Sequence, residues 1–304
     1  MGESRHNPNQ LLKAIQADEE NRNKGHLKIF FGYAAGVGKT YAMLEAAHME
    51  KQQGIDVVAG YIEPHARPKT AALLNGLEVL PTREVLYNGM ILNEFDIDMA
   101  LKRKPQLILV DELAHTNAEG CRHAKRYQDI KELLNAGIDV YTTVNVQHIE
   151  SLCDTVASIT EIVVRERIPD SIFDNADQVE LIDIEPQDLI DRLNTGNVYR
   201  QTQAKQAVEN FFTIENLTAL REIALRRCAD RVNILTENTR IKNHGDYHTG
   251  EHILVCLSSS PSNAKIIRTA AKMASAFKGE FTALFVETPD FSVMSEENVK
   301  RLRS

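Results

Sequence analysis

The stretch FGYAAGVGKT, residues 31–40, constrains the fold of this chain more than any other feature. It follows the apolar run LKIFF (27–31) and precedes the helix-forming stretch YAMLEAAHME (41–50). The order is therefore strand, glycine-rich loop, Lys-Thr and helix, which is the signature of a phosphate-binding loop. Backbone N–H groups of such a loop converge on phosphate oxygens at the start of a helix. A loop of this kind indicates a parallel α/β sheet with the ligand at its edge.

The residue types in the loop indicate separate tasks. Lys39 is expected to reach the outer phosphates of a nucleotide, and Thr40 to hold Mg²⁺. The glycine that usually opens the motif would fall at Tyr33, but here it stands one position earlier, at Gly32. A glycine-rich turn that binds nothing is the alternative interpretation. The residues predicted to contact the nucleotide are Gly32, Gly36, Val37, Gly38, Lys39 and Thr40.

A second signal supports a nucleotide site. The apolar run LILV (107–110) ends in Asp111 and Glu112. An acid at the end of a neighbouring parallel strand is placed to hold the magnesium of a bound nucleotide. We expect Asp111 to hold Mg²⁺ through water and Glu112 to orient or deprotonate an attacking water. Capping of a helix is the alternative role for either acid.

Polar residues also follow other apolar runs, at the edge where ligands bind in an open α/β sheet. They are Glu63, His65, Arg67, His115, Thr116, Asn117, Asn145, Gln147 and His148. Three histidines could suggest a metal, but their spacing supports no metal site, and a nucleotide site needs polar residues at this edge in any case.

The remaining pattern predicts α/β architecture, with a mostly parallel sheet that has helices on both faces. Strands are predicted at 27–31, 57–62, 107–110, 140–146, 161–164 and 178–184, with helices between most of them. Residues 186–235 are expected to be helical. The predicted domains are a polar arm (1–25), a nucleotide-binding domain (26–235), a linker (236–251) and an incomplete second α/β domain (252–304).

Composition excludes several classes of partner. The formal net charge is −8, so no nucleic-acid binding is expected. No apolar run is long enough for a membrane helix, and the N-terminus lacks the apolar core of a signal peptide. The four cysteines show no metal spacing and are expected to be free thiols. These features predict a cytoplasmic location.

Three segments make the assignment more specific: KIFFGYAAGVGKTYAMLEAA, the long block from DELAHTN to TTVNVQHIESL, and VRERIPDSIFDNADQVELIDI. Together they resemble the N-terminal cytoplasmic domain of the KdpD family, the potassium-responsive sensor histidine kinases of bacteria. The resemblance covers about residues 8–235, and the shifted glycine is also a feature of that family's loop. The resemblance implies a regulatory module that binds ATP and Mg²⁺. It also implies that full-length members of the family are anchored in the inner membrane.

The C-terminal segment resembles the start of the universal-stress-protein-like domain that follows in that family. Ser258 and Ser260, followed after a spacer by Phe281 and Thr282, resemble a cyclic di-AMP site described for some members. The serine hydroxyls could meet a phosphate and the aromatic ring could stack on a base. A serine-rich turn and a core strand are the alternative interpretation.

The family resemblance favours a regulatory module over two alternatives. One is a stand-alone P-loop kinase or NTPase for a small molecule, and the other is an interaction scaffold with a vestigial nucleotide site. The chain shows no kinase core, and no arginine is clearly placed to assist hydrolysis, so weak ATPase activity at most is expected. The expected partners are nucleotides, the remainder of the sensor kinase and, indirectly, its response regulator.

Overall fold

The computed structural model describes residues 24–63, 68–87, 89–194, 211–243, 252–257, 263–276 and 280–285. The chain divides into two compact units, Met1–Arg231 and Val232–Ser304. Nearly all of the predicted N-terminal arm lies outside the described residues, as do His65 and Arg67.

The first unit is built on a six-stranded sheet with the order β3-β2-β6-β7-β1-β8, in which every pairing is parallel. This confirms the predicted α/β class, and five strands lie close to their predicted positions. The strands are β1 (Leu27–Gly32), β2 (Val57–Tyr61), β3 (Glu78–Val79), β6 (Leu107–Val110), β7 (Asp139–Asn145) and β8 (Gln178–Leu181).

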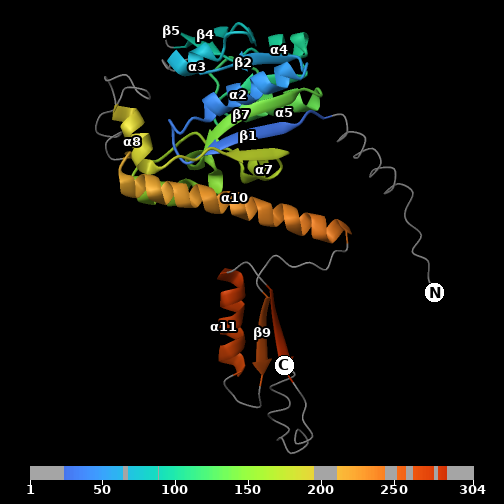
Figure 1. Cartoon of the computed structure of the whole chain (residues 1–304), viewed down its shortest axis with the longest axis vertical. Coiled ribbons are helices and arrows are strands. Elements are labelled where there is room, and N and C mark those ends of the chain that lie inside the picture. The colour runs from blue at the N-terminus through green and yellow to red at the C-terminus, as the bar shows by residue number, and fades with distance from the viewer. Residues whose placement is uncertain are drawn as a thin grey trace, which may run out of the picture. The chain divides into compact units, whose positions relative to one another are not determined.

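Helices cover both faces of this sheet, because successive side chains of each buried strand point to opposite sides (Figure 1). On one face, Phe30 of β1 belongs to the same core cluster as Met43 and Leu44 of α2 (Lys39–Gln52). On the other face, Ile29 and Phe31 lie in a larger cluster. The helices that contribute to the larger cluster are α4 (Ile97–Arg103), α5 (Arg126–Asn135), α6 (Cys153–Thr160), α7 (Asp170–Asp174), α8 (Pro186–Asn194) and α10 (Ile214–Asn243).

Two helices of this unit, α2 and α5, end just before a glycine. Gly54 follows α2 and Gly137 follows α5, with φ angles of 91° and 79°. Only glycine adopts this left-handed conformation without a steric penalty, so it commonly terminates helices. Further short elements of this unit are α3 (Pro68–Ala72) and the 3₁₀ turns η1 (Val146–His148) and η2 (Glu150–Leu152).

An antiparallel hairpin between β2 and β6 in the chain was not foreseen. It consists of β4 (Arg83–Tyr87) and β5 (Met90–Glu94). Most of its side chains are exposed, but Glu94 at its end is buried. The hairpin therefore places a carboxylate in the interior next to the loop that follows β6.

One predicted strand is absent. Residues 161–164 form no strand: Glu161 caps α6 with a φ of 59°, and Val163 is 70% exposed. The outer neighbour of β1 is β8, which pairs with it in parallel and was predicted as a strand at 178–184. The segment predicted as a linker from residue 236 begins within α10, which continues to Asn243.

The described part of the second unit contains β9 (His252–Leu257), α11 (Asn263–Ala276) and β10 (Glu280–Phe285), with β9 and β10 paired in parallel. Phe281 and Thr282 lie on β10, where Phe281 is 37% exposed. Ser258 and Ser260 lie outside the described residues. No helix in the described ranges is long and apolar enough to cross a membrane.

Candidate functional site

The loop after β1 contains two glycines with left-handed backbone conformations. Gly36 and Gly38 have φ angles of 95° and 112°, a region that other residues rarely adopt. Gly32 is needed for a different reason, because a Cβ atom there would lie 2.6 Å from Val37 Cγ2 and 3.2 Å from Lys39 Cδ. The loop thus folds closely over position 32, which explains why glycine stands there.

The residue at the usual glycine position has a structural role instead. Tyr33 is fully buried, and its hydroxyl donates to the Ile184 carbonyl at 3.1 Å. This contact ties the loop to the segment between β8 and α8. Lys39 is also buried, at 8% exposure, and its Nζ donates to the Ala34 carbonyl at 3.0 Å. The ammonium group therefore lies against the inner side of the loop.

The predicted acid at the end of β6 contacts the loop directly. Thr40 Oγ1 donates to Asp111 Oδ2 at 3.0 Å. On its other oxygen, Asp111 accepts a hydrogen bond from the Thr143 hydroxyl on β7. Three segments that are distant in the sequence, the loop, β6 and β7, therefore meet at one carboxylate that is only 2% exposed.

These side chains surround a cavity of about 90 Å³. Since this is the size of a small group and not of a whole nucleotide, a base and ribose bound here would lie outside it. Most of its lining comes from the ends of β1, β6 and β7, at the edge where the topology of an open α/β sheet places ligands. The lining residues are Ala35, Gly36, Gly38, Lys39, Thr40, Asp111, Glu112, Ala114, His115, Thr143, Val144, Asn145, His148 and Glu166.

Glu112 has two unusual properties. Its φ is 60°, a backbone conformation that is uncommon outside glycine and is often found at functional sites. Burial raises the pKa of its carboxyl to about 7, with smaller contributions from the negative charges of Asp111 and Glu63. A carboxyl with a pKa near neutrality can both accept and release a proton, which is the property expected of a general base.

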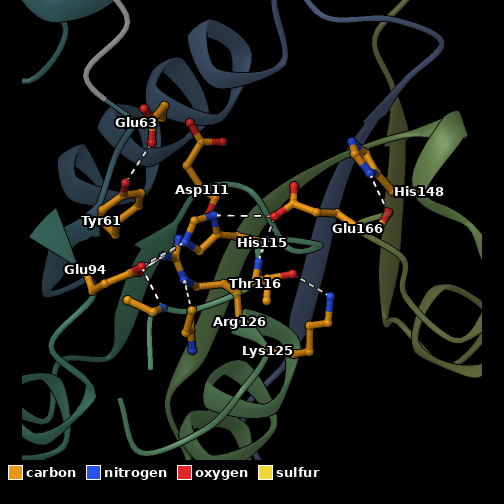
Figure 2. A network of polar contacts seen from close by, with 12 residues as sticks. Tyr61, Glu63, Glu94, Asp111, His115, Thr116, Lys125, Arg126, His148 and Glu166 are labelled. Carbon is orange, nitrogen blue, oxygen red and sulfur yellow. Dashed lines mark hydrogen bonds and ion pairs between the residues drawn. The ribbon is translucent and has the colours of Figure 1, made fainter. Parts of the chain in front are cut away.

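A buried ion pair between Arg126 and Glu94 lies next to the backbone of Asp111 (Figure 2). The guanidinium of Arg126 is fully buried and donates to Glu94 at 3.0 Å and to the Asp111 carbonyl at 3.1 Å. It also lies 4.2 Å from the centre of the Tyr61 ring. Arg126 therefore joins the end of the hairpin to the backbone of the cavity's central acid.

Glu94 is satisfied on several sides, as a buried carboxylate must be. Burial alone would raise the pKa of Glu94, but the hydrogen bond from His115, at 3.1 Å, and the backbone N–H of Ala118 hold the pKa below its ordinary value. Glu94 is therefore ionised at neutral pH and holds both His115 and Arg126 in place.

A second group of contacts centres on Glu166, which lines the cavity (Figure 2). The carboxylate of Glu166 accepts from the Thr116 backbone N–H at 2.9 Å, and its carbonyl accepts from His148 Nδ1 at 2.9 Å. Lys125 donates to the Thr116 hydroxyl. Burial lowers the pKa of His148, so its imidazole is neutral at pH 7.

One basic residue that the sequence did not indicate lies beside the loop. Arg192 of α8 places Nη1 3.5 Å from the Val37 carbonyl, and a Cβ atom on Gly38 would lie 3.9 Å from the same nitrogen. The two residues are 155 positions apart, so no local motif could have connected them.

The sequence foresaw most of the cavity but not all of it. The predicted residues Gly36, Gly38, Lys39, Thr40, Asp111 and Glu112 line it together. Gly32 and Val37 support the loop from within. Of the residues not predicted, Thr143 could have been found from its alternation with Asn145 along β7, whereas Glu166 lies in an irregular segment without a motif.

The oxygen atoms at the site fit magnesium. Thr40 and Asp111 supply one hydroxyl and one carboxylate within hydrogen-bonding distance, and Mg²⁺ is commonly held by one or two such groups together with nucleotide phosphates. In the described ranges, the site included, no cluster of three or more His, Cys, Asp or Glu side chains could hold a metal ion by itself.

Comparison with known proteins gives consistent matches. Residues 23–232 match the family described as "Osmosensitive K+ channel His kinase sensor domain". Sensor protein KdpD of Clostridium acetobutylicum is 59% identical over 287 residues, covering 93% of this chain and 32% of the relative. Sensor protein KdpD of Escherichia coli (strain K12) is 49% identical over 305 residues, covering 99% and 33%. That of Mycobacterium tuberculosis (strain H37Rv) is 46% identical over 265 residues, covering 86% and 31%. The chain spans about a third of the length of these relatives.

Proposed function

The chain belongs to the KdpD sensor-domain family, and we propose that it is a nucleotide-binding regulatory module of a two-component system that responds to potassium. In this proposal the cavity beside the phosphate loop binds the phosphates of Mg-ATP. The occupancy of the cavity then sets the output of a sensor kinase, which acts on a response regulator.

One observation carries the nucleotide part of the proposal: Thr40 and Asp111 lie 3.0 Å apart, with Lys39 and the glycine loop around the same cavity. Mg²⁺, when bound, would neutralise phosphate charge between these two side chains. Lys39 would turn from the Ala34 carbonyl to the outer phosphates, where a charge-assisted hydrogen bond is stronger than one to a neutral carbonyl.

The buried pair of Arg126 and Glu94 suggests how occupancy could reach the surface. Arg126 holds the Asp111 carbonyl, and Glu94 ends the exposed hairpin β4–β5. A shift of Asp111 on binding of Mg-ATP would therefore act on the hairpin through a rigid, buried contact. In this proposal the hairpin is an element through which the state of the cavity reaches the surface.

A graft tests the regulatory role. The N-terminal third of the Escherichia coli relative is replaced by this chain, and phosphoryl transfer to the response regulator is measured at low and high potassium. We expect phosphoryl transfer by the graft to depend on potassium. Lys39→Ala, which would no longer bind ATP at the loop, is expected to change the level of phosphoryl transfer. An output that is identical in the graft and in its Lys39→Ala variant would contradict the proposal.

Hydrolysis of ATP is a second candidate function, favoured by Glu112. Its carboxyl lines the cavity next to Asp111 and has a pKa of about 7, so it could take a proton from an attacking water. Phosphate release by the purified chain that is lost in Glu112→Gln would establish this activity. Turnover is expected to be slow.

Binding of cyclic di-AMP remains a proposal for the second unit. Phe281 is partly exposed at the start of β10, where its ring could stack on a base, and Thr282 follows it. Titration of the full chain with cyclic di-AMP, compared with Phe281→Ala, tests it. Binding that is unchanged by the substitution, or no binding at high micromolar ligand, would remove this part of the proposal.

A further inference from the structure

The inference concerns a groove on the first unit that shares no lining residue with the cavity beside the phosphate loop. The groove has a volume of about 570 Å³, whereas that cavity has about 90 Å³. Side chains of α5 and of α7 line it on two sides, together with residues at the start of β1. Since the phosphate loop follows the end of β1, the groove is a separate feature of this unit.

The floor of the groove is apolar. Tyr127, Ile130 and Leu134 lie on one face of α5, because they follow one another at helical spacing, and Ile172 of α7 lines the groove as well. Ile130 is only 1% exposed, but the other three side chains are partly exposed where they pack against the core. A segment that lies between the two helices would remove this apolar surface from water, which is favourable.

The chain enters the described part of the first unit at this groove. Lys24, the first described residue, lines it together with Gly25. The Gly25 N–H donates to the Leu134 carbonyl at 2.8 Å, and a Cβ atom on Gly25 would lie 2.0 Å from the Ile138 carbonyl oxygen. The backbone therefore passes tightly against the end of α5, and residues 1–23 are attached directly at the groove.

The sequence attached there is complementary to the groove. Residues 8–22 read PNQLLKAIQADEENR, and their large apolar side chains are Leu11, Leu12 and Ile15. This spacing is typical of one face of a short helix. Three acidic residues follow at positions 18–20, and the groove is lined by Lys131, an exposed lysine of α5. The segment thus offers apolar side chains for the floor and negative charge for the lysine.

We propose that residues 8–22 of the same chain dock in this groove, with their apolar side chains on its floor and their acids near Lys131. Nine positions separate Ile15 from Lys24, so the connection spans up to about 30 Å and the groove is within reach. A tether of this length holds the segment at a millimolar effective concentration, so weak contacts are sufficient.

The docked segment covers a helix that also supports the phosphate-binding site. Helix α5 begins with Arg126, whose guanidinium donates to the Asp111 carbonyl. The segment therefore lies on the same helix as the buried ion pair, although it contacts other residues of it. The proposal does not depend on nucleotide binding and can be tested without a nucleotide.

The test uses the full chain and a fluorescent peptide with the sequence of residues 8–22. The double substitution of Leu11→Asp and Ile15→Asp should release the chain's own segment from the groove. We expect the peptide to bind the double variant at least about ten-fold more tightly than the unmodified chain, whose groove is already occupied. Lys131→Glu in the double variant should weaken peptide binding about two- to five-fold. Lys102→Glu, at an exposed lysine of α4, is the matched control and should leave it unchanged.

Thermal unfolding checks that each variant is folded. The proposal is overturned if the peptide binds the unmodified chain and the double variant equally, or does not bind the double variant. Equal effects of Lys131→Glu and Lys102→Glu would also overturn it, because the peptide would then bind elsewhere. Gel filtration adds a further test: a dimer of the unmodified chain that becomes monomeric in the double variant would show that the segment docks on a second copy and not on its own chain.

Discussion

Thr40 and Asp111 are joined by a 3.0 Å hydrogen bond, although 71 positions separate them in the sequence and β7 lies between their strands. Thr143 of β7 donates to the other oxygen of Asp111, which explains how an acid can reach a loop that is two strands away. The carboxylate is therefore held from both sides before any ligand is present.

Asp111→Asn is predicted to remove the effect of magnesium on nucleotide affinity. Asparagine has nearly the same shape as aspartate but no charge, so it would be a poor partner for a hydrated divalent cation. The effect is measured by titrating the protein with ATP, once in the presence of Mg²⁺ and once in the presence of EDTA. A variant that still binds ATP more tightly with Mg²⁺ than with EDTA would contradict the assignment of Asp111.

Arg126→Met is predicted to lower the free energy of unfolding by about 3–5 kcal/mol, because it leaves Glu94 buried without its main cationic partner. Urea denaturation measures the change. Arg122→Ala is the control: Arg122 also forms ion pairs, with Asp98 and Glu132, but its side chain is 41% exposed. The control should cost less than about 1 kcal/mol. Equal losses would mean that burial of the Arg126 pair has no special role.

His148 is predicted to make the chain less stable in acid. Burial lowers the pKa of its imidazole in the folded state, so the unfolded chain binds the proton more readily. The stability that depends on the neutral ring is present above pH 6.5 and decreases as the pH falls below it.

His148→Gln should therefore reduce the loss of thermal stability between pH 7.5 and pH 5.5, where both pH values are about one unit from the ordinary pKa of histidine. His26 gives a control of opposite sign, because its hydrogen bond with Asp177 raises the pKa of an exposed imidazole. An unchanged or steeper pH dependence in His148→Gln would contradict the prediction.

Arg192→Ala is predicted to weaken binding of Mg-ATP by about three- to ten-fold, since its guanidinium lies next to the loop that would hold the phosphates. Arg226→Ala is the control: Arg226 is an exposed arginine of α10 that pairs with Glu222. Identical affinities in the two variants would show that the position of Arg192 beside the loop has no part in binding.

Local patterns predicted the central part of the fold well. The alternation of buried runs and helical segments is repeated along the chain, so β1, β2, β6, β7 and β8 were expected, with helices between most of them. The strand predicted at 161–164 is absent because a short apolar run alone does not identify a strand. Which strand pairs with β1 on its outer side could only be learned from the packing of the whole sheet.

The residues of the site also fall into two groups, those that a sequence motif indicates and those that only the tertiary structure reveals. Lys39, Thr40 and Asp111 carry their own sequence signals, since strand, loop and helix context accompany them. Arg126 and Arg192 carry none: one is an ordinary first residue of a helix, and the other is 155 positions from the carbonyl it approaches. Both contacts depend on tertiary structure. The hairpin that brings Glu94 to Arg126 was missed for the same reason.

The central claim is that the loop at residues 32–40 binds the phosphates of Mg-ATP. Isothermal titration calorimetry of the purified chain with Mg-ATP, alongside Lys39→Ala, tests it most directly. We predict one-site binding by the unmodified chain and an affinity about ten- to hundred-fold weaker in Lys39→Ala, with thermal unfolding showing that the variant is folded. Equal affinities in the two proteins, or no heat of binding in the unmodified chain, would contradict the claim.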